Sequence, residues 1–121
     1  MKIFDSHVHT GYIHNTFCNP ELIAGIIENE DAMALSSSLS GYNLGQRFAN
    51  QETARLVQLS NKRVKGLVYF CPYDPECIAD AEYCIKNGFV GIKLHPVGNF
   101  YDITLDNILK NNAKKLFNLK P

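Results

Sequence analysis

The sequence predicts an α/β protein built on parallel strands, and two observations support this fold class. Strand-like and helix-like segments alternate four times along the 121 residues, which is typical of β/α units joined by right-handed crossovers. Residues 64–70 are apolar almost throughout, as expected for a strand that is covered on both faces. Both an open flavodoxin-like sheet and part of a (β/α)8 barrel fit this pattern.

The first two β/α units are predicted within residues 2–61. In chain order they comprise a strand at 2–8, a helix from Pro20, a strand at 32–36, a loop at 36–41 and a helix at 46–61. Pro20 suits the first turn of its helix, because a backbone N–H at that position would have no partner within the helix. The apolar face of this helix is formed by Leu22, Ile23, Ile26 and Ile27.

The next two units are predicted within residues 64–118. In chain order they comprise a strand at 64–70, a helix from Pro75 through Ile85, a strand at 89–95, a loop at 96–101 and a helix at 104–118. Asp74 is the predicted N-cap of the helix that begins at Pro75, and Asn87-Gly88 is its predicted stop. Four such units make half of a (β/α)8 barrel, which usually needs roughly 250 residues.

Composition indicates which partners the chain lacks. Twelve basic and twelve acidic residues cancel, and 45% of the residues are apolar. This balance gives no electrostatic indication of a nucleic acid or an anionic membrane surface. No apolar run approaches the roughly 20 residues of a membrane-spanning helix, so one cytoplasmic domain is expected. The four cysteines form no Cys-x-x-Cys pair, and we expect Cys77 and Cys84 to be packing residues on one helix face.

The most informative motif is Asp5-Ser6-His7-Val8-His9, on the first predicted strand. Because the side chains of a strand alternate between its faces, Asp5, His7 and His9 are expected to point the same way. Two imidazoles in this arrangement can bind one divalent ion, each through one ring nitrogen. Asp5 can orient one of the rings from outside the ligand shell. We therefore predict a metal site, most simply a zinc site, with His7 and His9 as ligands.

Lys93 and His95 are a second pair of candidate site residues. Alternation places both on one face of the fourth predicted strand. A lysine that points into a barrel is costly unless it is paired or functional. His95 ends its strand, as His7 and His9 end theirs, and a barrel gathers its active-site groups at these carboxyl ends. The positions of the histidines therefore favour the partial barrel over the open sheet.

Three segments resemble the amidohydrolase superfamily of metal-dependent hydrolases, in particular the amidohydrolase-related branch that includes decarboxylases and lactonases. They are residues 5–9, 61–72 and 88–96, of which Gly88 to Pro96 is the most specific. The resemblance implies a divalent metal, most simply zinc, and a small-molecule substrate. Metal-activated water would cleave a C–N, ester or lactone bond, or the site would support C–C cleavage.

The resemblance also implies roles for Lys93 and His95. Some members of the superfamily carry a carboxylated lysine on this strand that bridges two metals. In this branch Lys93 has the alternatives of pairing with Asp5 or binding a substrate carboxylate. His95 would contact the metal-bound water or the substrate, or would be a satisfied structural histidine beside Pro96. Lys93 and His95 are thus the candidate catalytic residues.

The resemblance further implies that the second half of the barrel is missing. Residues 108–119 resemble the helix that closes these enzymes, yet they follow the fourth strand almost directly. We expect one truncated domain over 1–121, with a half-barrel at 1–101 and a C-terminal helix at 102–121, produced by an internal deletion. The alternative is that 104–118 is simply the fourth helix. Since the later strands supply further ligands in this family, little or no activity is expected of the chain alone.

Two other functions remain open. A metal-dependent phosphoesterase of the polymerase-and-histidinol-phosphatase type also opens with Asp-x-His-x-His-Thr, which residues 5–10 match, although the fourth strand does not fit it. The other alternative is a non-catalytic half-barrel remnant. Its open strand edges and apolar face would favour a homodimer, in which two copies close eight strands.

Overall fold

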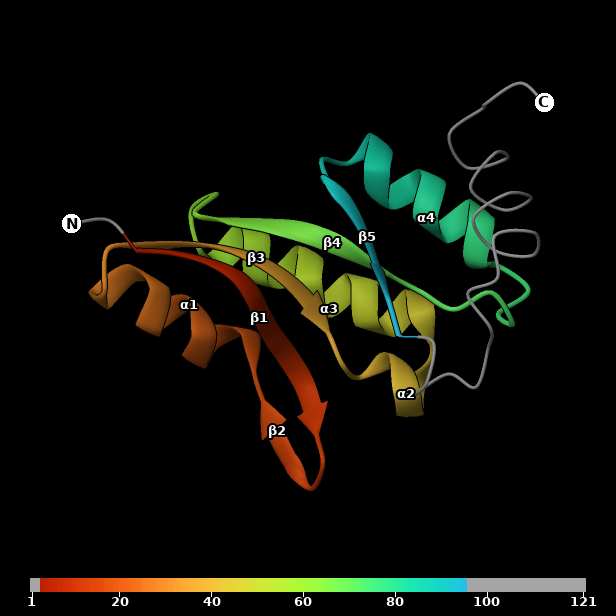
Figure 1. Cartoon of the computed structure of the whole chain (residues 1–121), viewed down its shortest axis with the longest axis horizontal. Helices are drawn as coiled ribbons and strands as arrows, with labels where there is room; N and C mark the ends of the chain where they lie inside the picture. The colour runs from red at the N-terminus through yellow and green to blue at the C-terminus, as the bar shows by residue number, and fades with distance from the viewer. Residues whose placement is uncertain (1–2, 96–121) are drawn as a thin grey trace.

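Five strands form one sheet in the computed structural model, which describes residues 3–95, and helices cover one side of the sheet (Figure 1). The strands are β1 (Ile3–Ile13), β2 (Thr16–Cys18), β3 (Ala32–Ser38), β4 (Val64–Phe70) and β5 (Gly91–Leu94). The helices are α1 (Pro20–Asn29), α2 (Gly41–Leu44), α3 (Gln46–Leu59) and α4 (Cys77–Lys86). No helix of this part of the chain is long and apolar enough to cross a membrane.

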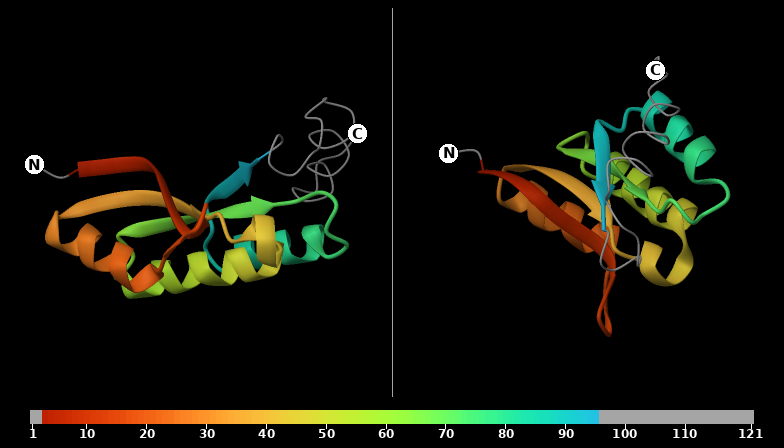
Figure 2. Two further views of the ribbon diagram at one scale, coloured as in Figure 1. Left: turned by 90° about the horizontal axis from the view of Figure 1, so that it is seen from below. Right: turned by 45° about the vertical axis from the view of Figure 1, so that its right-hand side comes forward.

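The parallel strands lie in their order along the chain. The sheet order is β2-β1-β3-β4-β5, and β1 with β3, β3 with β4 and β4 with β5 pair in parallel. Figure 2 (left) shows α1, α3 and α4 on the same side of this sheet. A flavodoxin-like sheet instead reverses its strand order and has helices on both faces. The predicted α/β class with a mostly parallel sheet is therefore confirmed, and the flavodoxin-like alternative is wrong for residues 3–95.

The first strand is longer than predicted. β1 continues past residue 8 to Ile13 and turns back into β2, with Gly11 paired to Cys18 in antiparallel register. Across this hairpin the rings of Tyr12 and Phe17 lie 4.8 Å apart, a cross-strand aromatic pair that stabilises it. No strand was predicted between residue 8 and Pro20, and the turn lacks the Asn-Gly or Asp-Gly signature of tight hairpins.

Two other predicted boundaries are corrected. The segment predicted as a loop at 36–41 continues β3 to Ser38 and then begins α2 at Gly41. The helix predicted from Pro75 begins at Cys77 with Glu76 as its N-cap residue. Asp74 Oδ1 accepts a hydrogen bond of 2.9 Å from the Glu76 backbone N–H, so Asp74 stabilises the turn before the helix and is not its N-cap.

The core lies between the sheet and its helices, in two clusters. One joins α1 and α3 to β3 and β4 through Ala24, Ile27, Ala32, Ala34, Leu56 and Val64. The other joins α4 to β4 through Val68, Phe70, Cys77, Ala81, Cys84 and Phe89. Cys77 and Cys84 are free, buried thiols, which confirms the prediction that they pack on one helix face.

Between β3 and β4 the sheet opens, and side chains of α3 replace the strand pairing. The β3–β4 register ends at Ser36 and Gly66. Beyond it, Asn50 Oδ1 accepts from the Tyr69 backbone N–H at 2.7 Å, and Asn50 Nδ2 donates to the Tyr69 carbonyl at 3.2 Å. The amide thus satisfies backbone groups that a neighbouring strand would otherwise pair. It also fixes the carboxyl end of β4, where the candidate site lies.

Candidate metal site at the carboxyl edge of the sheet

His7 and His9 bring their rings together at the edge of the sheet. The two Nε2 atoms lie 2.8 Å apart, and the rings meet edge to face. Two nitrogens that bind one tetrahedral zinc at about 2.0–2.1 Å lie about 3.3 Å from each other. A small outward rotation of the rings would therefore admit the ion. The pair has the convergence that a shared metal requires.

The backbone of β3 determines which nitrogen of His9 is available. His9 Nδ1 lies 3.0 Å from the carbonyl oxygen of Ser37, and a carbonyl oxygen can only accept. Nδ1 therefore carries a proton and donates it, which leaves Nε2 of the neutral ring with its lone pair. A hydrogen bond of this kind from the non-ligating nitrogen is what fixes metal-binding histidines in proteins. Nε2 of His9 thus presents its lone pair towards His7.

Asp5 contacts the histidine pair through the backbone of His7. Its Oδ1 accepts a hydrogen bond of 2.9 Å from the backbone N–H of His7. The register of β1 against β3 shifts between Asp5 and Val8, so β1 carries one extra residue there. Strict alternation is therefore interrupted between Asp5 and Val8, whereas the contact between the rings of His7 and His9 shows that these two side chains point the same way.

The fourth parallel strand approaches the histidine pair across the sheet. Lys93 lies on β5, and His95 is the first residue after that strand. Because β3 and β4 separate β1 from β5, a flat sheet would hold such side chains about 14 Å apart. The ring centroids of His9 and His95 are in fact 5.9 Å apart. The sheet is therefore curved. Side chains converge at this edge on the face that no helix of residues 3–95 covers, which we call the uncovered face.

Burial and neighbouring positive charge disfavour protonation of His95 and His9. Burial lowers the pKa of His95 to about 4, and the charges of His9, Lys93 and His7 contribute. Burial also lowers the pKa of His9, with smaller contributions from the charges of His7 and Lys93; the hydrogen bond to the Ser37 backbone opposes the shift. Lys93 is thus close enough to act electrostatically on both rings. Neutral imidazoles are the form that binds metals.

Two tyrosines that sequence reasoning missed stand beside His95. The Tyr69 ring stacks on the His95 ring with centroids 5.4 Å apart. The Tyr42 ring meets the His95 ring at 5.4 Å and the Tyr69 ring at 5.7 Å, both edge to face. The alternation of side chains along β4 is the sequence signal that could have indicated Tyr69, because it puts Tyr69 on the same face as Lys65 and Leu67. No pattern in the sequence indicates Tyr42, since α2 is a four-residue helix.

Other histidines and ligands do not complete the site. His14 lies in the turn between β1 and β2 with φ 55°, exposed to solvent. Among residues 3–95 no group of three or more His, Cys, Asp or Glu side chains could hold a metal ion. A catalytic zinc usually has three protein ligands and a water, so a site with His7 and His9 alone would be one protein ligand short.

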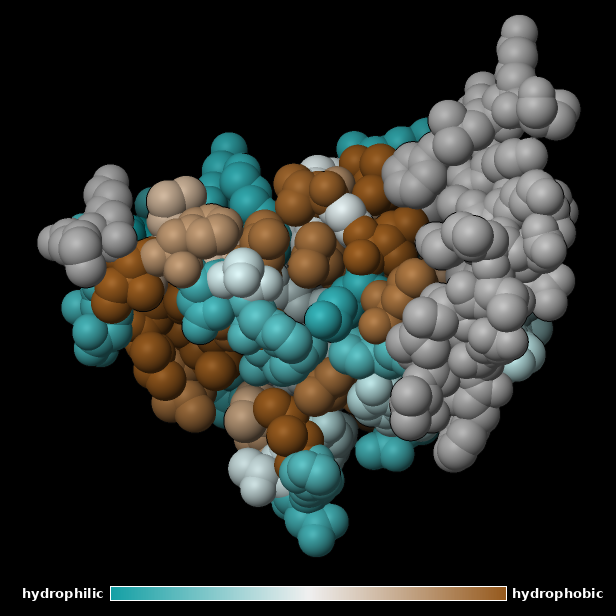
Figure 3. Space-filling model, viewed as in Figure 1, coloured by the Kyte–Doolittle hydropathy of each residue, from teal (hydrophilic) through white to brown (hydrophobic). Residues whose placement is uncertain are grey.

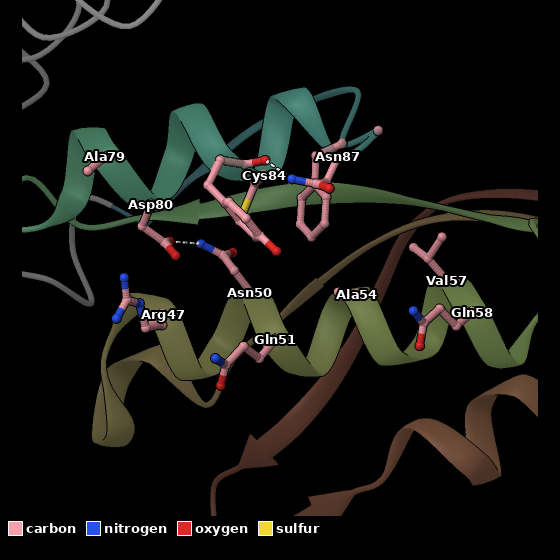
Figure 4. Close-up of a pocket in the computed structure, with 13 residues that line it drawn as sticks. Arg47, Asn50, Gln51, Ala54, Val57, Gln58, Ala79, Asp80, Cys84 and Asn87 are labelled. Carbon is pink, nitrogen blue, oxygen red and sulfur yellow. Dashed lines mark hydrogen bonds between the residues drawn. The ribbon is translucent and has the colours of Figure 1, made fainter.

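A separate cavity of about 560 Å³ lies between α3 and α4 (Figure 4). Asn50, Asp80, Cys84 and Phe89 are among its lining residues, and none of the candidate site residues lines it. Its polar side chains bond to each other, since Asn50 Nδ2 donates to Asp80 Oδ2 at 2.6 Å. Burial, with the charge of Asp80, raises the pKa of Cys84 to about 12. Cys84 is therefore a protonated thiol and a poor nucleophile.

Comparison with known proteins identifies no relative. No family model, no curated protein and no solved structure matches this chain.

Proposed function

We propose that this chain is a metal-dependent hydrolase of the amidohydrolase type, in which His7 and His9 hold one divalent ion, most simply zinc. The observation that carries the proposal is the 2.8 Å approach of the two Nε2 atoms. Two lone pairs at this separation repel each other unless a proton or a cation lies between them. A zinc ion would replace the proton that His7 shares with His9 when no metal is bound.

The fold supports the finer proposal of a partial (β/α)8 barrel. Four parallel strands in chain order, with α1, α3 and α4 on one side (Figure 2), are the arrangement of half of such a barrel. The curvature that brings His9 within 5.9 Å of His95 has the sense that barrel closure needs. The predicted C-terminal helix at 102–121 lies outside the described residues.

The residues around the ion would have distinct tasks. When bound, a divalent ion lowers the pKa of water and polarises a carbonyl group. Ser37 keeps His9 in the tautomer that presents Nε2. Lys93 contributes positive charge beside His9 and His95, which suits either a substrate carboxylate or, after carboxylation, a bridge to a second metal. His95 would contact the metal-bound water or the substrate.

The incomplete ligand set predicts weak binding and low activity. A catalytic zinc site usually has three protein ligands. His7 and His9 would provide two, and no third His, Cys, Asp or Glu among residues 3–95 joins them. Binding through two imidazoles competes poorly with water. We therefore expect zinc to exchange readily, and any hydrolysis of a small amide, ester or lactone to be slow.

The two alternatives make different predictions. A phosphoesterase would need the same His7 and His9 but would prefer phosphate esters. A non-catalytic remnant would bind no metal. A panel of lactone, amide and phosphate-ester substrates, offered with zinc and with manganese, separates the two enzymes by which bond is cleaved.

The partner expected for the open sheet is a second copy of the chain. Among the described residues, no strand pairs with the outer edge of β5, and none pairs with the edge of residues 3–10 of β1 that faces away from β3. On the uncovered face Phe4 is 62% and Met33 is 37% exposed, and Figure 3 shows apolar patches around a hydrophilic centre on this face. A dimer would cover these groups. Sedimentation of a monomer would contradict it.

Metal analysis tests the central proposal. At equilibrium with a fixed concentration of free zinc, the unsubstituted chain should bind up to one zinc per chain. His7→Ala should bind little, whereas His14→Ala, which changes a histidine in the β1–β2 turn, should match the unsubstituted chain. Cobalt in place of zinc should give visible absorption bands that His7→Ala lacks. Equal metal content in all three proteins would overturn the proposal.

A further inference from the structure

The aromatic cluster beside the histidine pair has one member that faces outward. Tyr69 is fully buried, whereas Tyr42 remains 41% exposed. The Tyr42 ring contacts both the His95 and the Tyr69 rings edge to face. Tyr42 is therefore supported from behind by two rings and presents surface to solvent at the carboxyl edge of the sheet.

The backbone of α2 holds Tyr42 in this position. Gly41 precedes it, and a Cβ at Gly41 would overlap the ring of Tyr69. Only glycine lets α2 approach Tyr69 so closely. The close approach seats the next residue, Tyr42, against Tyr69 and His95. The ring is thus placed before any ligand arrives, and little conformational entropy is lost when it makes a contact.

The cluster is continuous with the proposed metal site. The His95 ring lies 5.9 Å from the His9 ring and 5.4 Å from the Tyr42 ring, centroid to centroid. One imidazole therefore links Tyr42 to the histidine pair, and a planar substituent on a group bound at His7 and His9 would extend along His95 towards Tyr42. Lys93, whose charge acts on both His9 and His95, lies on the same face.

We propose that Tyr42 is a specificity-determining residue that selects substrates with an aryl or other planar unsaturated group next to the function bound at His7 and His9. The inference rests on the proposed metal site and names the substrate class for it. Aromatic rings in edge-to-face or offset contact attract each other beyond the burial of their area. A planar substituent should therefore bind about threefold to tenfold more tightly than a methyl group of the same head group.

Two hydroxamates test the proposal, because they share a metal-binding head group. Benzohydroxamate carries a phenyl ring and acetohydroxamate a methyl group. On the zinc-loaded full chain, calorimetry should show tighter binding of benzohydroxamate. Tyr42→Ala should remove this preference and leave acetohydroxamate unchanged. Tyr42→Phe, which keeps the ring, should retain the preference, and so should Tyr73→Ala, which removes an exposed tyrosine from the turn before α4.

A second measurement does not depend on the variants being folded. In the unsubstituted chain, magnetisation transfer should connect the phenyl protons of benzohydroxamate with the ring protons of Tyr42. Its absence, or a preference for benzohydroxamate that survives Tyr42→Ala, would overturn the inference while zinc binding still supported the metal site. Failure of the unsubstituted chain to bind zinc at equilibrium would instead overturn the proposed function, and this inference with it.

Discussion

Polar side chains are arranged differently on the two faces of the sheet. On the helix-covered face, the buried polar side chains of α3 and α4 are paired with backbone or with other side chains, whereas the buried Thr10 and Ser36 hydroxyls have no hydrogen-bond partner within residues 3–95. Asp80 accepts from Asn50 and from Gln46 at 2.6 and 3.1 Å, and Ser38 donates to Glu52 at 2.5 Å. On the uncovered face, His7 and His9 are aimed at each other, with His95 close by.

This difference separates side chains that maintain the fold from those placed for binding. Buried polar groups that are fully hydrogen-bonded contribute to a unique packing, and they are expensive to disturb. Groups that converge at an accessible edge stabilise the fold little, and a bound ligand is the explanation that we propose for their arrangement. Substitutions on the two faces should therefore have opposite profiles, with stability lost on one and binding lost on the other.

The largest expected effect is at Asn50. Asn50→Ala removes the bonds to both backbone groups of Tyr69 and to Asp80. It leaves buried donors and acceptors unpaired, which should lower the free energy of unfolding by about 4 kcal/mol. Urea denaturation measures this loss. The neighbouring exposed residue provides the control, because Gln51→Ala should change stability by less than about 0.5 kcal/mol. Similar losses in both variants would show that the amide bridge is unimportant.

The next effect contrasts two leucines of α3. Leu56 is fully buried in the cluster that joins α1 to the sheet, whereas Leu59 is 44% exposed. Leu56→Ala should cost about 3 kcal/mol, because it removes buried methyl groups and leaves a cavity. Leu59→Ala should cost well under 1 kcal/mol, since alanine also favours the helix. Thermal or urea unfolding of the two variants compares them directly, and equal losses would mean that α3 packs through another face.

The smallest effect on stability is expected at the histidine pair. His7 is exposed, and its ring contacts His9 rather than the core. His7→Ala should therefore change the free energy of unfolding by no more than about 0.5 kcal/mol, although it removes the proposed zinc ligand. Unfolding measured without metal checks this value. A loss comparable to that of Asn50→Ala would mean that His7 maintains the fold.

Local signals predicted most elements, and they failed where contacts distant in sequence decide. Pro20 and the apolar positions after it placed α1 correctly, and the apolar run at 64–70 placed β4. The hairpin of β1 and β2 was missed because it depends on the pairing of Tyr12 with Phe17 across the turn. The start of α4 was misplaced because Asp74 caps a turn instead of the helix.

The sequence by itself determined the α/β class, the parallel strands and the histidines of the first strand. These follow from periodicity and from residues that are adjacent along the chain. The tertiary structure alone decided that His9 donates to Ser37, that Asp5 bonds to the backbone, and that His95 and Tyr42 lie together. Such contacts join residues from different strands and helices. They depend on the register and curvature of the sheet, which local sequence patterns do not specify.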